Sequence, residues 1–281
     1  MHSLSASLPK PGWMRELIAI WGYAQRNYYL TKRYFMWEVV WLVYSTMNAL
    51  TIGFIGVGLG GSPEATARTT TFLLIGTMVW SYLSMIFDLL SETVSWERWE
   101  GTIEYTFMAP LSRAMHLAGQ GIFAIIYGLL RAAFLFVVCA FLFFDLAMPN
   151  AQFFPAFVVL LVSSVSFIGI GMMMSVLPLI SPEKGTQLGF VAQGTLLVVS
   201  GVYYPVDVLP QWMQWIATIS PATYALDGIR EAILEGQGLT AMWDELWPLM
   251  IIGVISIPLG LWVFSRGERY AKKHGKLKRS G

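Results

Sequence analysis

The residues best suited to covalent chemistry or metal binding are few in this chain and lie far apart. His2, His116 and His274 sit at or beyond the ends of apolar stretches and lack zinc-ligand spacing. The single cysteine, Cys139, falls inside an apolar stretch and is interpreted as a small core residue. There is no HExxH, GxSxG or GxxxxGK[ST] motif. We therefore predict no catalytic residue, metal or cofactor on this chain, and no ATP hydrolysis without a partner.

A charged turn after the second apolar stretch has the most specific spacing in the sequence. Glu97, Glu100 and Glu104 recur at three and four residues and so would share one helix face. Gly101 permits a break in that helix, and Pro110 stops it. This predicts a structured elbow of about 25 residues, longer than a simple connection needs. The alternative is a solvated interfacial turn. The candidate residues for contact with a partner protein at this elbow are Glu97, Arg98, Glu100, Gly101, Thr102, Glu104, Pro110 and Arg113.

Polar side chains inside the apolar stretches form narrow stripes. Thr77, Ser81, Ser84 and Asp88 follow one another at spacings of four, three and four. In hydrocarbon each such group needs a partner or water, so two interpretations stay open: hydrogen bonds between helices, or a path for an amphipathic passenger. The candidate pathway residues are Asn48, Thr77, Ser81, Ser84, Arg131, Gln193 and Ser200.

Arg131 is the most unusual of these residues because it falls about midway along an apolar stretch. A charge there costs at least ~2.5 kcal/mol to insert, which argues against exposure to lipid. Asp88 is the candidate partner, reached by snorkelling of the arginine along its helix. A structural ion pair and contact with an anionic passenger are both compatible with the sequence.

The elements that must position these residues are membrane helices. The chain of 281 residues is 56% hydrophobic and only 12% charged, with a mean hydropathy of +0.59. That charge fraction is about half of what a soluble domain carries, and the net charge of +1 does not suit a nucleic-acid binder. We predict an all-α membrane protein with six spans of about 20 residues each. They are placed at Phe35–Leu59, Thr69–Leu90, Ala118–Phe144, Phe153–Ile180, Leu188–Tyr204 and Trp247–Phe264.

The distribution of Lys and Arg predicts the orientation. These residues crowd residues 1–34, the elbow and residues 266–281, whereas the opposite loops are acidic and rich in Trp. By the positive-inside rule both termini lie in the cytoplasm. No linker divides the chain. We therefore expect an interfacial segment at 1–34, one transmembrane domain at 35–265 and a basic cytoplasmic tail at 266–281.

Two segments outside the spans have an apolar face of their own. Leu17, Trp21 and Tyr28 recur at helical spacing, which predicts an amphipathic helix in the membrane interface that either anchors the chain or contacts a partner. Residues 204–235 are too broken by proline to span, and we expect them to enter the outer leaflet as two short helices and return.

Two motifs resemble the membrane subunits of ABC-2 type transporters, the permease family of daunorubicin-type drug exporters and of polysaccharide exporters. Residues 97–104 with Pro110-Leu111-Ser112-Arg113 are similar to the family's E-x-x-x-G-T-x-E and P-x-S-R pattern. A second pattern is similar to the family's S-G-x-x-x-P, L-P-x-W and P-x-T-Y-A signature. It consists of residues 200–205, followed by Leu209-Pro210, Trp212, Pro221-Ala222-Thr223-Tyr224-Ala225 and Arg230. The similarity covers nearly the whole chain.

The resemblance implies an ATP-driven exporter in a bacterial inner membrane. Two cytoplasmic ABC ATPase subunits would bind ATP and Mg²⁺, and a second permease copy would complete a homodimer. Residues 92–113 would hold the coupling helix and residues 204–235 the re-entrant outer helices. The implied outer gate residues are Tyr203, Tyr204, Pro205, Trp212, Pro221 and Tyr224.

The passenger and the function class stay open at the level of sequence. Thin stripes dominated by Ser and Thr, with adaptable surface at Met172–Met174, favour a hydrophobic or amphipathic molecule, drug-like or lipid. A surface polysaccharide or lipid-linked glycan is the alternative passenger. In a different class, the chain would be a membrane scaffold or sensor that anchors a soluble partner without transporting anything.

Overall fold

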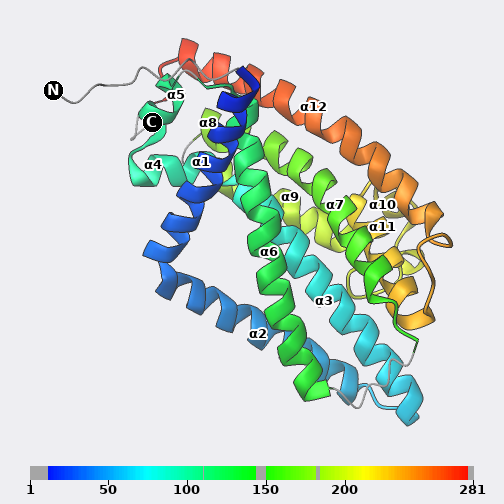
Figure 1. Ribbon diagram of the computed structural model, residues 1–281. Coiled ribbons are helices and arrows are strands. Elements are labelled where there is room, and N and C mark those ends of the chain that lie inside the picture. Colours follow the sequence, from blue (N-terminus) through cyan, green and yellow to red (C-terminus); the bar gives the residue numbers. More distant parts are fainter. Residues whose placement is uncertain (1–11, 110, 144–149, 182–183, 278–281) are drawn as a thin grey trace.

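The computed structural model describes residues 12–109, 111–143, 150–181 and 184–277, and all regular structure in these ranges is helical (Figure 1). The N-terminal half of the chain forms α1 (Gly12–Arg33), α2 (Phe35–Gly58), α3 (Pro63–Ser91), α4 (Thr93–Glu100), α5 (Ile103–Met108) and α6 (Arg113–Phe143). The remainder are α7 (Phe153–Met174), α8 (Val176–Ile180), α9 (Gly185–Val199), a 3₁₀ turn (Val206–Val208), α10 (Gln211–Ala217), α11 (Pro221–Arg230), a π turn (Glu231–Glu235) and α12 (Trp243–Lys273).

Five of the predicted spans are confirmed as helices long and apolar enough to cross a membrane. They are α2, α3, α6, α7 with α8, and α12. The predicted span Leu188–Tyr204 is instead the shorter helix α9, which has 15 residues and a length of about 22 Å. It ends at Val199 because the backbone turns at Gly201, whose φ of 69° is left-handed.

Helix α3 lies at the centre of the bundle, where it packs against α2, α6, α7 and α11. Its Tyr82 and Phe87 are fully buried, and the Tyr82 hydroxyl hydrogen-bonds to Ser164 of α7 at 2.7 Å. The closest pair is α7 and α12, which approach through Gly169 and Gly260. Small residues let helix backbones come close enough for dense packing where lipid supplies no hydrophobic drive.

Helices α1 and α2 form the looser side of the molecule. Helix α1 lies along α6, burying Ala24, while Leu17, Trp21 and Tyr28 of its predicted apolar face are exposed. Helix α2 leans away from the bundle in Figure 1 and touches it mainly near its C-terminal end. Most of its large side chains are exposed within one chain, so this helix has surface left for lipid or a partner.

The two ends of the bundle carry different elements. Helices α4, α5 and α8 gather with the C-terminal end of α12 at one end, and α10 and α11 lie toward the other with the start of α12 (Figure 1). The two short helices predicted within 204–235 are present as α10 and α11. Helix α12 runs beyond the predicted span to Lys273, so residues 266–273 of the predicted basic tail are helical.

Candidate functional site

The elbow consists of two helices rather than one. Helix α4 ends at Gly101, whose φ of 72° is left-handed, and the amides of Gly101 and Thr102 donate back to the carbonyls of Arg98 and Glu97. This is the capping geometry that glycine supports best. The break predicted at Gly101 is confirmed. The shared face predicted for the three glutamates is wrong, because Glu104 lies on α5.

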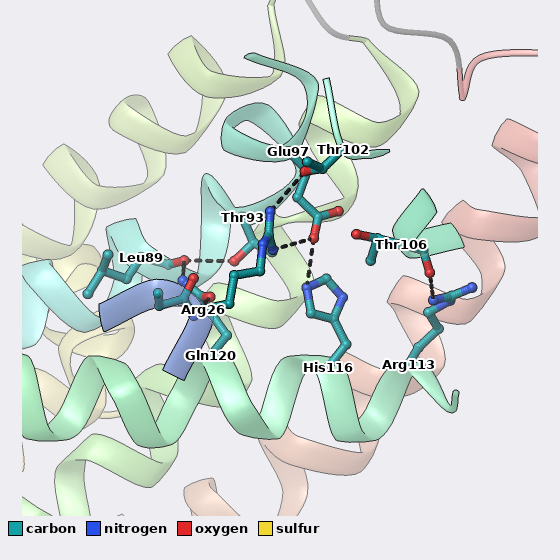
Figure 2. Close-up of polar contacts among 10 residues, drawn as sticks. Arg26, Leu89, Thr93, Glu97, Thr102, Thr106, Arg113, His116 and Gln120 are labelled. Atoms are coloured by element: carbon teal, nitrogen blue, oxygen red, sulfur yellow. Dashed lines mark hydrogen bonds and ion pairs between the residues drawn. The ribbon is translucent and has the colours of Figure 1, made fainter. Parts of the chain in front are cut away.

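Glu97 is the centre of a buried polar cluster (Figure 2). Its side chain is 1% exposed, and Oε1 lies 3.0 Å from Arg26 Nη1 and 3.1 Å from His116 Nε2. Arg26 also donates to Thr102 Oγ1 at 2.9 Å, so α1 is bonded to both sides of the Gly101 break. Within the described part of the chain, Glu97 Oε2 has no hydrogen-bond partner. This geometry joins α1, α4 and α6 and leaves Glu97 no surface for a partner protein.

Further polar contacts extend this cluster along α6. Gln120 donates to the Leu89 carbonyl at 2.8 Å and accepts from Asn27 of α1, while Thr93 also donates to Leu89 (Figure 2). The three contacts fasten α1, α3 and α6 where α3 gives way to α4. A buried network holds its elements in one arrangement only while its members remain paired.

Arg113 connects the elbow to α12. Its guanidinium donates to the carbonyls of Thr106 and Phe107 at 2.7 and 2.8 Å, and to Glu268 at 3.1 Å. The two carbonyl bonds satisfy the end of α5, which has no further helical turn to do so. Lys272 also reaches Glu268, at 2.7 Å. Arg113 therefore fixes α5 to α6 and α12 from inside the structure.

Two other predicted contact residues are also committed to the fold. Arg98 is buried and donates to the carbonyls of Leu179 and Lys276, and burial lowers the pKa of its guanidinium. Glu100 accepts from Arg33 at 3.2 Å and from the Tyr34 hydroxyl at 2.7 Å. Arg98 is thus bonded within the chain, and its role in contacting a partner stays a prediction. Pro110, also predicted here, lies outside the described residues.

Part of the surface that the elbow presents was missed at the sequence level: Glu104 was predicted, but its neighbours Tyr105 and Met108 were not. Tyr105 is 73% exposed and Met108 71%, and Glu104 on the same short helix is also exposed. Leu111 follows them on the surface. The available signal was the spacing of three between Tyr105 and Met108, which places two large apolar side chains on one side of a helix in a polar turn.

Arg131 does not pair with Asp88, so that expectation is corrected. Its guanidinium donates to Ser45 Oγ at 3.0 Å, lies 3.5 Å from Met85 Sδ and sits 5.9 Å from the centroid of the Tyr127 ring. Asp88 instead accepts from Gln193 of α9 at 3.0 Å. The two residues face different neighbours of α3, since Arg131 meets α2 and Asp88 meets α9.

The remaining pathway residues are divided between bonded and exposed positions. Thr77 and Ser84 bond to carbonyls of their own helix, and the buried Ser200 hydroxyl pairs with Ser220 at 2.7 Å. Ser81 is partly buried, and Asn48 of α2 is exposed. The structure therefore favours interhelical bonding for Gln193 and Ser200 and leaves Asn48 on the open side.

At the far end, a buried arginine holds the chain turn that follows α9. Arg230 donates to the Gly201 and Val202 carbonyls at 2.9 and 2.7 Å and stacks on Phe72 at 3.6 Å. This residue belongs to the sequence signature, but its position as the support of the turn required the structure. Its bonds hold the turn against α3.

The predicted gate residues lie around this turn in different settings. Tyr204 and Tyr224 donate to the carbonyls of Val198 and Thr218. Pro205 precedes the 3₁₀ turn and Pro221 begins α11, where a missing N–H costs nothing. Tyr203 is partly buried and Trp212 of α10 is exposed. Each proline begins a short element, as its fixed φ favours.

Comparison with known proteins agrees with this architecture. "Probable multidrug ABC transporter permease YbhR" of Escherichia coli (strain K12) is 27% identical over 192 residues, which are 68% of this chain and 48% of YbhR. "Linearmycin resistance permease protein LnrN" of Bacillus subtilis (strain 168) is 32% identical over 109 residues, 38% of this chain and 28% of LnrN. The chain thus spans about half the length of YbhR.

The sequence profile of the family described as ABC-2 type transporter matches residues 15–234, which include α2, α3 and α6, the elbow, α9 and the α10–α11 segment. The match extends over most of the chain and contains both motif regions. This chain is a multi-pass membrane protein that belongs to the ABC-2 type transporter family.

Proposed function

We propose that this chain is the membrane subunit of an ATP-driven exporter that moves a hydrophobic or amphipathic molecule, drug-like or lipid, outward. Separate ABC ATPase subunits would bind ATP and Mg²⁺. The family match and the names of two relatives, a multidrug permease and a linearmycin resistance permease, support the proposal. Two permease copies would share the exposed side of α2.

The proposed topology places the elbow in the cytoplasm of a bacterial cell, with the chain in the inner membrane. Helix α9 would complete a sixth pass together with the turn that follows it, and α10 and α11 would re-enter the membrane from outside. The basic C-terminal part of α12 and the lysines and arginines of α1 lie at the elbow end, which supports this orientation by the positive-inside rule.

The single observation that carries the proposal is the contrast between the two surfaces of the elbow. Its inner surface is bonded to α1, α6, α8 and α12 through Glu97, Arg98 and Arg113, whereas Tyr105 and Met108 point into open space. A tip that is both exposed and rigidly attached to four other helices is suited to receive movement from a partner and pass it to the bundle.

The test is ATP hydrolysis by the partner in the presence of purified permease. Tyr105→Ala and Met108→Ala are expected to lower permease-stimulated hydrolysis at least about tenfold, because large exposed side chains at an interface centre carry most of its binding energy. Phe141→Ala is the matched control, since this equally exposed aromatic residue lies at the far end of α6.

Normal stimulation by both tip variants would contradict the coupling assignment. If the elbow instead captured a partner that lacks a phosphate-binding loop, the scaffold or sensor reading would replace the exporter. Thermal unfolding of each variant must match that of the parent protein, which excludes misfolding as the cause of lost stimulation.

A further inference from the structure

A cavity of about 410 Å³ lies beside the elbow, between the α1–α2 junction, α4 and the start of α9. Its volume falls within the range of small-molecule sites. Four aromatic residues and one acid dominate its lining: Tyr34, Trp37, Trp96, Trp99 and Glu92. Of these lining residues, only Tyr34 takes part in the polar contacts described above, through its hydroxyl bond to Glu100.

The rings form a connected wall. The Tyr34 and Trp99 centroids are 5.2 Å apart, and Trp96 meets Trp99 edge-on at 5.3 Å. Trp37, on the first turn of α2, also lines the cavity. The face of an aromatic ring is negative, so rings gathered around a space attract a positive charge.

The formal charge of the cavity lining also favours a positively charged guest. Among the described lining residues, Glu92 alone carries a formal charge. Burial raises the pKa of this carboxyl, while a hydrogen bond from Trp96 lowers it. Two nearby arginines are engaged elsewhere, since Arg26 pairs with Glu97 and Arg33 with Glu100. A partly buried carboxyl beside four aromatic side chains would gain from a cationic guest.

Other classes of guest fit less well. An anion would be repelled by Glu92 and by the ring faces, and a neutral apolar molecule would remove the carboxyl from water without replacing the lost interactions. The hydroxyls of Ser95 and Thr186, 3.1 Å apart, already hydrogen-bond to each other, so a sugar finds few free polar groups here.

We propose that the cavity bounded by Tyr34, Trp37, Trp96, Trp99 and Glu92 is a binding site for a hydrophobic organic cation, such as a substituted ammonium or phosphonium. The aromatic rings surround the cation and Glu92 supplies the counter-charge. Binding at this site does not depend on transport. The identification of the cation as an exported passenger rests on the function proposed above.

The test is equilibrium dialysis of the purified full-length chain in dodecyl maltoside, a neutral detergent, against radiolabelled tetraphenylphosphonium. Saturable binding of one cation per chain is expected. Tetraphenylborate has the same shape and the opposite charge, and it should not compete. Glu92→Gln and Trp99→Leu are each expected to raise the dissociation constant at least about tenfold.

Two controls separate this site from ordinary interfacial aromatic and acidic residues. Trp21→Leu removes an exposed tryptophan of α1 that does not line the cavity, and Glu16→Gln removes an exposed acid of the same helix. Both should bind like the parent chain. Equal binding of the borate, or parental affinity in Glu92→Gln and Trp99→Leu, would overturn the proposal. Glu92→Gln keeps the shape of the side chain, so the test survives if Trp99→Leu fails to fold.

Two additions identify the source of the cation and separate the two proposals. Displacement of the phosphonium by phosphatidylethanolamine, but not by phosphatidylglycerol, would assign the site to a lipid ammonium, whereas no displacement would assign it to a free organic cation. Binding without ATP-dependent movement of the cation would leave the site intact and contradict its role in export. If the chain bound no cation but exported other molecules, the cation site would be contradicted and the proposed export function would be kept.

Discussion

Glu97 shows at the scale of one residue how a charged turn acquires a fixed shape. A glutamate in a polar loop is expected at the surface, yet this side chain lies between Arg26 and His116 with almost no exposure. Removing one partner of a buried ion pair is costly because the remaining charge stays out of water. The Arg26–Glu97 ion pair therefore holds α1 against the elbow.

We predict that Arg26→Met lowers the stability of the protein by about 2 kcal/mol, less than a fully buried pair would lose because Arg26 is partly exposed. Adding Glu97→Gln to Arg26→Met should recover part of the loss, since the unpaired charge is gone. Thermal unfolding in detergent measures both effects. Arg33→Met is the control, because its pairing with Glu100 is largely exposed; an equal loss there would remove the special role of burial.

Glu231 provides a prediction about pH at the opposite end of the bundle. Burial, with Glu245, Glu235, Asp227 and Asp244 nearby, raises the pKa of its carboxyl from 4.5 to about 7. The fold thus favours the protonated form, so this residue destabilises it increasingly as the pH rises from 4.5 to 7, and fully above 7. Glu231→Gln should raise the unfolding temperature at pH 8 and leave it unchanged near pH 4.5. A gain of equal size at both pH values would contradict this origin.

Among the secondary-structure elements, α4 and α5 are bonded to several neighbouring helices. Bonds from α1, α6 and α8 end on these two helices, Arg113 of α6 is bonded in turn to Glu268 of α12, and Gly101 separates α4 from α5. A displacement of α5 by a partner would therefore act on several long helices together. This is the arrangement expected of a coupling element, and it follows from side chains that point inward.

The contact between α7 and α12 should tolerate substitution least. A Cβ built on Gly169 would lie 2.2 Å from Ser256 Oγ and 2.6 Å from the Ser256 carbonyl carbon, so the helices would have to separate. Gly169→Ala is expected to lower the yield of folded protein severalfold in size-exclusion chromatography. Gly22→Ala, with no neighbour within 4 Å, should not. Parental yield for Gly169→Ala would show that this contact is looser than described.

On the scale of the whole molecule, the long helices leave much apolar surface uncovered within one chain. Helix α2 has little burial of its own, and the apolar residues of α9 are largely exposed. Lipid or a second copy of the chain would have to cover them, because exposed apolar surface of this extent is unfavourable in water. The proposed homodimer supplies that cover.

The proposed orientation predicts which end reacts from outside the cell. In a Cys139→Ser background, Ala241→Cys beside the start of α12 should react with a membrane-impermeant maleimide in intact cells. Ser112→Cys at the elbow should react only after the cells are permeabilised. Both positions are exposed and small in the parent chain. The opposite labelling pattern would place the elbow outside and exclude coupling to cytoplasmic ATPases.

The sequence by itself determined the helical class, five of the long helices, the break at Gly101, the short helices after Pro210 and Ser220, and the family. These features depend on the length of apolar runs and on the local conformational limits of glycine and proline, which act within a few residues. The elbow was located from its motif for the same reason, whereas the turn at Gly201 was not, since the sequence predicted a span that continued to Tyr204.

Only the tertiary structure decided which side chains face inward. It buried Glu97 and Arg98, exposed Tyr105 and Met108, and separated Arg131 from Asp88. Each outcome depends on how one helix is rotated against another, and that rotation is fixed by contacts between residues distant in sequence. The aromatic cavity beside Glu92 exists for the same reason, since its walls come from three separate parts of the chain.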